Sequence, residues 1–201
     1  PNNKYDKVVS GYHSTVALLT GNLGYDIWGQ SMAPAGNANQ LSPTPINTTN
    51  YPTLSGTVLK ATIGGTSGGF PDQAVVLTTD GLYAWGIEGV VINTNYTASP
   101  AVTKLTTITG SNTYGLPTGV TPTDVKMLFV TEMTIALTTC SGNVYVLTQR
   151  PINAGVGTTA NATQWYQVTT SATGNPALSN VIAVRGSKNT LVALTSNNEL
   201  Y

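Results

Sequence analysis

The segment Val75-Val76-Leu77-Thr78-Thr79-Asp80-Gly81-Leu82-Tyr83-Ala84-Trp85-Gly86 decides how the rest of the chain is interpreted. Two short apolar runs, Val75–Leu77 and Leu82–Trp85, flank Thr-Thr-Asp-Gly. The Asp-Gly pair supplies the positive-φ positions that a tight hairpin connection requires. The segment therefore predicts a β-hairpin.

Weaker copies of this hairpin recur along the chain at a spacing near sixty residues. All four copies share an apolar run ending in Leu-Thr, a polar turn and a following Tyr; the Leu-Thr pairs begin at Leu19, Leu77, Leu137 and Leu194. Each hairpin is preceded by a short β-rich run and followed by a loop and another strand, so a repeat contains about four strands. A repeat of roughly 40 to 50 residues with four strands is typical of a propeller blade, and long insertions extend it to the spacing seen here.

Several motifs in the first two copies resemble a known repeat. Gly11-x-His13 leading to Ala17-Leu18, followed by Tyr25-x-x-Trp28-Gly29-Gln30 and Leu41-x-Pro43, is similar to the unit of the regulator-of-chromosome-condensation β-propeller superfamily. The resemblance covers essentially the whole chain and weakens in the last two copies, which lack the His and the Trp-Gly pair. It implies a fold rather than one activity, because this repeat occurs in proteins of many functions.

The resemblance implies an all-β fold of four-stranded antiparallel blades, here about three blades plus the start of a fourth. We place the repeats approximately at residues 7–57, 58–124, 125–180 and 181–201. Because propellers close with about four to eight blades, we expect a partial ring of a larger parent protein. The first residue is Pro1 rather than Met, which favours a processed product or an internal segment.

Composition limits the classes of partner. Of the 201 residues, 40% are hydrophobic and only 8% are charged, which argues against a disordered, highly charged chain. The formal net charge is +0, so the sequence offers no overall basic surface and we expect no nucleic-acid partner. No apolar run approaches the ~18 residues of a membrane span, and we expect no membrane insertion.

Candidate chemistry is sparse. The segment Gly65-Thr66-Ser67-Gly68-Gly69 resembles the surroundings of a hydrolase nucleophile, but the one histidine, His13, stands where the repeat itself has one, and Asp26 is the carboxylate considered to orient it. The same segment lacks the Lys of a phosphate-binding loop. A single cysteine, Cys140, fits a small semi-buried side chain, and no zinc or calcium spacing is present. We therefore expect no catalytic residues, no cofactor and no metal.

The aromatic residues divide into two groups. Those that recur with the repeat are interpreted as blade packing: Tyr25, Trp28, Tyr83, Trp85 and Tyr145. Those in the long connections are candidate partner contacts, because exposed rings on loops are common interface anchors: Tyr51, Tyr96, Tyr114, Trp165 and Tyr166.

The loops are rich in Thr and Asn, as in residues 46–51 and 92–97, and resemble those of bacterial surface proteins. We therefore expect a non-catalytic binding or adhesion module of a secreted or cell-surface bacterial protein, exported by type IX secretion. Its partner would be a protein or a surface glycan, with the secretion machinery as a further contact. One alternative is an inhibitor-type or regulatory propeller that binds one protein, as β-lactamase inhibitor proteins built on this repeat do. The other is a serine hydrolase that uses Ser67.

The hydrolase alternative is tested by Ser67→Ala. We expect the wild-type and Ser67→Ala chains to give the same background rates on a panel of ester and peptide substrates, because the sequence provides no base placed to activate Ser67. A hydrolytic activity that disappears with Ser67 would contradict the binding interpretation.

Overall fold

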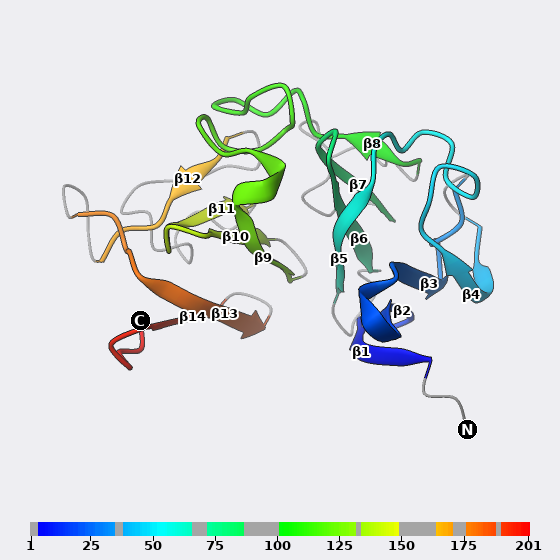
Figure 1. Ribbon diagram of the computed structural model, residues 1–201, viewed down its shortest axis with the longest axis horizontal. Coiled ribbons are helices and arrows are strands. Elements are labelled where there is room, and N and C mark those ends of the chain that lie inside the picture. The colour runs from blue at the N-terminus through cyan, green and yellow to red at the C-terminus, as the bar shows by residue number, and fades with distance from the viewer. Residues whose placement is uncertain are drawn as a thin grey trace.

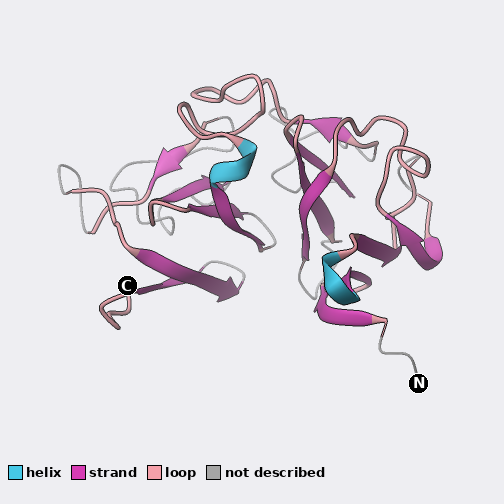
Figure 2. Cartoon of the chain, in the orientation of Figure 1, coloured by secondary structure: helices cyan, strands magenta, loops and turns pink. Residues whose placement is uncertain are grey.

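The computed structural model describes residues 4–34, 38–65, 72–86, 101–131, 134–148, 164–170, 176–187 and 190–201. These residues form antiparallel strands joined by loops, with two short 3₁₀ turns, η1 (Thr20–Asn22) and η2 (Pro122–Asp124), and no α-helix among them (Figure 2). Within the same residues, no helix is long and apolar enough to cross a membrane.

Four sheets follow one another along the chain, and within each sheet the strands are hydrogen-bonded in chain order. The first sheet contains β1 (Tyr5–Ser10), β2 (Ser14–Leu19), β3 (Tyr25–Gly29) and β4 (Gln40–Pro45). The second contains β5 (Val58–Gly64), β6 (Gln73–Thr78), β7 (Leu82–Gly86) and β8 (Thr103–Lys104). The third contains β9 (Val125–Val130), β10 (Thr134–Thr139), β11 (Val144–Thr148) and β12 (Tyr166–Gln167), and the fourth pairs β13 (Val181–Ser187) with β14 (Thr190–Thr195).

The sheets stand side by side in an arc, with their first strands on the inner side and their last strands on the outer side (Figure 1). On the inner side, β1 lies against β5, β5 against β9, and β9 against β13. This is the arrangement of consecutive propeller blades. The predicted all-β fold, with about three four-stranded blades and the start of a fourth, is confirmed.

Every inner strand carries an irregularity at the same place. The register shifts by one residue between Tyr5 and Lys7 in β1 and between Val58 and Lys60 in β5. The corresponding shifts in β9 and β13 lie between Val125 and Met127 and between Val181 and Ala183. A β-bulge adds one residue and increases the local twist, so four bulges at one position indicate four structurally equivalent strands.

One expected equivalence is wrong. Gly29 and Gly86 occupy the same place, because both have positive φ and a Cβ at either would collide with the first residue of the neighbouring strand. Counted from these glycines, Tyr83 corresponds to Asp26, whereas Tyr25 is one residue out of step and faces the other way. The first hairpin has a longer turn, so the Leu-Thr to Tyr spacing in the sequence does not preserve the register.

The core lies between the sheets rather than within one of them. In β6, where all six residues are buried, Ala74 and Val76 pack toward the first sheet while Val75 and Leu77 pack toward the third. A third cluster joins Ala136 of β10 to the fourth sheet. A strand buried on both faces accounts for the continuous apolar run in the sequence, where a half-exposed strand would alternate.

Trp85 and Trp28 offer a matched test of this packing. Trp85 is fully buried between the first two sheets and its Nε1 donates a hydrogen bond to the Met32 carbonyl (3.4 Å), whereas the equivalent Trp28 is half-buried beside Tyr5. We expect Trp85→Ala to lower the free energy of unfolding by about 3–5 kcal/mol. Trp28→Ala should cost clearly less in the same urea titration, and equal losses would contradict the inter-sheet core.

Candidate functional site

Two of the predicted partner contacts are buried inside the chain. Tyr51 is 0% exposed, its ring lies 5.3 Å from that of Trp85, and its hydroxyl donates to the Met32 carbonyl (2.9 Å). This burial raises the pKa of Tyr51. Trp165 is 6% exposed and its Nε1 donates to the Gly115 carbonyl (3.1 Å). The expectation that Tyr51 and Trp165 are exposed contacts is therefore wrong, because both rings pack in core clusters between neighbouring sheets.

The other three predicted contacts differ among themselves. Tyr114 is half-buried against the cluster between the second and third sheets, and Tyr166 is half-buried against the cluster between the third and fourth. Tyr96 lies outside the described residues. The structure does not bring these aromatic residues together at one surface. Tyr51 packs in the cluster between the first two sheets, whereas Tyr114 packs against the cluster between the second and third.

The groups considered for catalysis are also separated. Ser67 lies outside the described residues. Asp26 is buried, and its Oδ2 accepts hydrogen bonds from Lys4 Nζ (2.7 Å) and Tyr5 Oη (2.8 Å) rather than from His13. Cys140 is exposed, so the expectation of a semi-buried thiol is wrong. The residue lies in the turn after β10, outside the core. Among the described residues, no three His, Cys, Asp or Glu side chains are grouped to hold a metal ion.

A different group forms a built feature at one rim. Asp72, just before β6 of the second blade, accepts hydrogen bonds from the backbone amides of Tyr12 and His13 in the β1–β2 loop of the first blade. Both amide-to-carboxylate distances are 2.7 Å, and Asp72 is 1% exposed. A buried carboxylate that accepts two amides forms charge-assisted bonds, so it fixes the loop of one blade on the next.

Two glycines make room for this carboxylate. A Cβ at either Gly11 or Gly65 would collide with the Asp72 side chain. The loop is closed below by the Gly11 amide, which donates to the Ser14 carbonyl (2.9 Å), and by the Gln30 amide, which donates to the His13 carbonyl (3.1 Å). The amides of Gly11, Tyr12 and His13 and the carbonyl of His13 are thus all hydrogen-bonded within the chain.

The side chains that this loop presents are exposed. Tyr12 is 55% exposed, and its ring meets the exposed His13 ring edge-on at a centroid distance of 4.1 Å. We call Tyr12 and His13, with the Asp72 carboxylate that holds them, the clamped rim loop. An aromatic ring on a fixed backbone loses little conformational entropy on binding, which suits a contact residue.

Only part of this site can be recognised in the sequence. His13 stands in the repeat motif, whereas no motif of the sequence points to Tyr12 or Asp72. The available signal is a pair of glycines: Gly11 directly precedes Tyr12, and Gly65 directly follows β5. Their joint role appears only when the two blades are packed together.

The fold and the rim define the chain as a set of consecutive β-propeller blades that carries exposed loops on a packed scaffold. Neither a protein-family model nor a curated protein sequence matches it.

Solved structures resemble it throughout. Human WBSCR16 aligns over 96% of this chain with a TM-score of 0.63 and 18% identity. Yeast RCC1 (Prp20) bound to Kap60 aligns over 100% with a TM-score of 0.57 and 15% identity. Prp20p from Saccharomyces cerevisiae, whose binding to Gsp1p and histones was studied with its structure, aligns over 97% with a TM-score of 0.55 and 16% identity.

The chain spans less than half the length of these proteins, covering 44% of WBSCR16 and 44% and 45% of the two Prp20 chains. The likeness shows that the chain has the RCC1 type of propeller fold.

Asp72→Ala tests the clamped rim loop. It leaves two amides without their acceptor, so we expect a loss of about 1–3 kcal/mol in the free energy of unfolding. Amide hydrogen exchange should accelerate at Tyr12 and His13. The control is Asp6→Ala, because Asp6 is an exposed carboxylate that accepts one amide, from Gly21 (2.9 Å). Unchanged exchange at Tyr12 and His13 in Asp72→Ala would contradict the clamp.

Proposed function

We propose that this chain is a non-catalytic protein-binding module that contacts its partner through the clamped rim loop. The observation that carries the proposal is the exposed Tyr12–His13 pair held by the buried carboxylate of Asp72. The amides of this loop are already bonded within the chain, so a partner meets side chains in a fixed arrangement. Such preorganisation lowers the entropic cost of association.

Similar structures support the class of partner. The structure of yeast RCC1 (Prp20) was solved with Kap60 bound, and that of Prp20p was studied with Gsp1p and histones. These partners are proteins, which favours a protein over a small molecule as the ligand of this chain. Binding through loops on a rigid scaffold is a general use of such folds.

The setting that we propose is extracellular: a secreted or cell-surface bacterial protein with a role in adhesion. Loops that are rich in Thr and Asn, in a chain with only 8% charged residues, support this setting. An inhibitor-type propeller that binds one protein uses the same loop and differs only in what the partner does. A surface glycan as ligand and export by type IX secretion belong to the same proposal.

Site-specific photo-crosslinking tests the contact surface. A photoreactive phenylalanine analogue replaces Tyr12 in one sample and Leu23 in another, because Leu23 is also exposed and lies in the β2–β3 turn at the opposite rim. In extracts and membranes of the source cells, position 12 should yield a defined adduct that position 23 does not.

Competition shows whether the adduct is specific. Unlabelled wild-type chain should suppress the adduct at position 12, whereas His13→Ala should suppress it at least about tenfold less effectively, as expected for the loss of an anchor residue. The adduct should be resistant to deglycosylation. Identical adducts from both positions, or equal competition by both chains, would contradict the rim-loop proposal, and an adduct that is removed by deglycosylation alone would replace the protein partner with a glycan.

Cell fractionation tests the compartment separately. With an antibody raised against this chain, we expect the signal at the cell surface or in the culture medium. A signal confined to the cytosol would refute the extracellular setting and leave the rim-loop contact unaffected.

A further inference from the structure

The inner strands carry an unusual share of the positive charge. Each of the four has one basic residue: Lys7 in β1, Lys60 in β5, Lys126 in β9 and Arg185 in β13. They are half of the eight Lys and Arg residues in the chain, and the inner strands contain one acidic residue, Asp6. A net charge of +0 therefore describes the whole chain but not its inner side.

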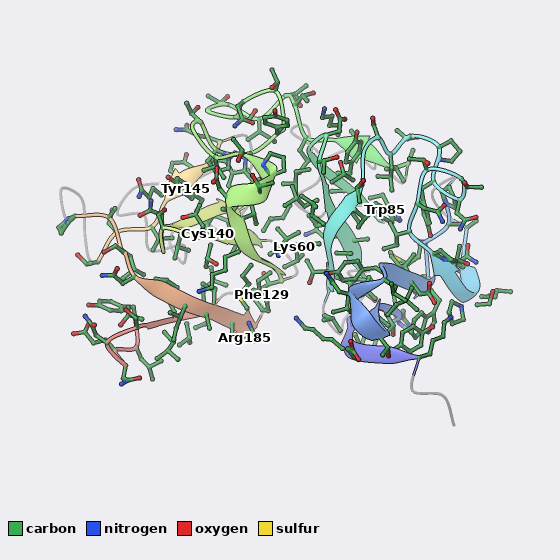
Figure 3. All side chains as sticks on the ribbon, viewed as in Figure 1. Lys60, Trp85, Phe129, Cys140, Tyr145 and Arg185 are labelled. Carbon is green, nitrogen blue, oxygen red and sulfur yellow. The ribbon has the colours of Figure 1, made fainter. Side chains whose placement is uncertain are left out.

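The four cations lie at related places around the arc. Lys7 and Lys60 occupy the same register position, the first residue after the bulge, and Lys126 is the bulge residue of β9. In β13 the first residue after the bulge is Ala183, and Arg185 lies two residues beyond it. Lys7, Lys126 and Arg185 are exposed and Lys60 is partly exposed. Figure 3 shows Lys60 and Arg185 on the inner side of the arc, where β1, β5, β9 and β13 are consecutive neighbours.

These charges are not neutralised by the described part of the chain. The ion pairs there are Lys4 with Asp26 and Lys104 with Asp80, and none of the four cations takes part in either. The carboxylate of Asp6 accepts a hydrogen bond from the Gly21 amide (2.9 Å) instead. Arg185 Nη1 donates to its neighbour's carbonyl, that of Val184 (2.7 Å), which fixes the guanidinium but leaves its charge uncompensated.

The backbone of the inner side is also suited to a ligand. Among the described strands, β1, β5, β9 and β13 each pair with one strand, so each presents an edge on the inner side of the arc. An edge strand offers backbone N–H and C=O groups to an extended peptide, which supplies affinity independent of side chains.

We propose that the inner surface of the arc binds an extended acidic polypeptide segment, whose carboxylates meet Lys7, Lys60, Lys126 and Arg185 while its backbone pairs with a strand edge. We call this surface the inner basic row. It is a site distinct from the clamped rim loop, so either proposal can fail without the other. A peptide is favoured over nucleic acid because four cations fall short of the about 6–10 phosphate contacts of tight DNA binders, and because phosphate chains do not pair with strand edges.

The probe is a fluorescein-labelled decaglutamate peptide, and its binding to the full chain is followed by fluorescence anisotropy. We expect binding that weakens as NaCl is raised, because screening reduces attraction between exposed charges. Decalysine labelled in the same way should not bind. Decaglutamate with alternate backbone nitrogens methylated has the same charge but fewer N–H donors, and it should bind at least about threefold more weakly if an edge strand takes part.

Single charge removals locate the site. Lys60→Gln and Lys7→Gln should each weaken decaglutamate binding by about three- to tenfold, because each removes one charge-assisted contact. Lys104→Gln removes the same charge from β8, on the outer side, and should change binding by less than about twofold. The circular dichroism spectra and thermal midpoints of all three variants are compared to exclude loss of folding.

Three results would overturn the proposal. They are an absence of decaglutamate binding at low salt, an equal loss in Lys104→Gln and Lys60→Gln, and tighter binding of a single-stranded oligothymidine of equal charge, which would assign the row to nucleic acid. Selective loss in Lys7→Gln and Lys60→Gln, together with weaker binding of the methylated peptide, establishes the inner basic row as an acidic-peptide site.

Discussion

The arc depends on the burial of both faces of its middle sheets. An isolated hairpin or single sheet is marginal in water, because it leaves at least one apolar face exposed. In β6, alternate residues pack toward the first and third sheets, and all six are buried. Each blade thus stabilises the next, and the order of blades along the chain becomes their order in space.

Two aromatic residues outside the strands, Tyr51 and Trp165, contribute to this core. Tyr51 reaches in from the connection between β4 and β5, and it shares the Met32 carbonyl with Trp85 as a hydrogen-bond acceptor. Trp165 is buried between the second and third blades, where its Nε1 donates a hydrogen bond to the Gly115 carbonyl. Aromatic side chains are costly to expose, and loops of this length have enough reach to bury them. In the described part of the chain, the exposed rings of Tyr12 and His13 belong instead to a short, clamped segment, the β1–β2 loop.

Charged residues are few, at 8% of the chain, and the two buried carboxylates named above have definite partners. Asp72 joins two blades through backbone amides, and Asp26 is covered by Lys4 and Tyr5 at the position where the second blade has Tyr83. The basic residues of the inner strands are arranged differently, since they are without a carboxylate partner among the described residues. The buried carboxylate of Asp72 orders the backbone and that of Asp26 is bonded by two side chains, whereas the exposed cations remain available for a ligand.

The sequence by itself determined the elements that depend on neighbours in the chain. Alternating and continuous apolar runs, the Asp80-Gly81 turn and the recurring Leu-Thr pairs were enough to predict hairpins, four-stranded blades and their repetition. It also marked His13 as part of the repeat. These features are local, because a strand and its turn are encoded within about a dozen residues.

Only the tertiary structure decided which residues meet across blades. The contact between Asp72 and the loop at Tyr12 and His13 joins positions about sixty residues apart, and the burial of Tyr51 and Trp165 depends on packing between neighbouring sheets. The difference in register between Tyr25 and Tyr83 likewise follows from turn length and strand pairing. Such contacts arise from packing between segments that share no local pattern, so periodicity and composition carry no signal for them.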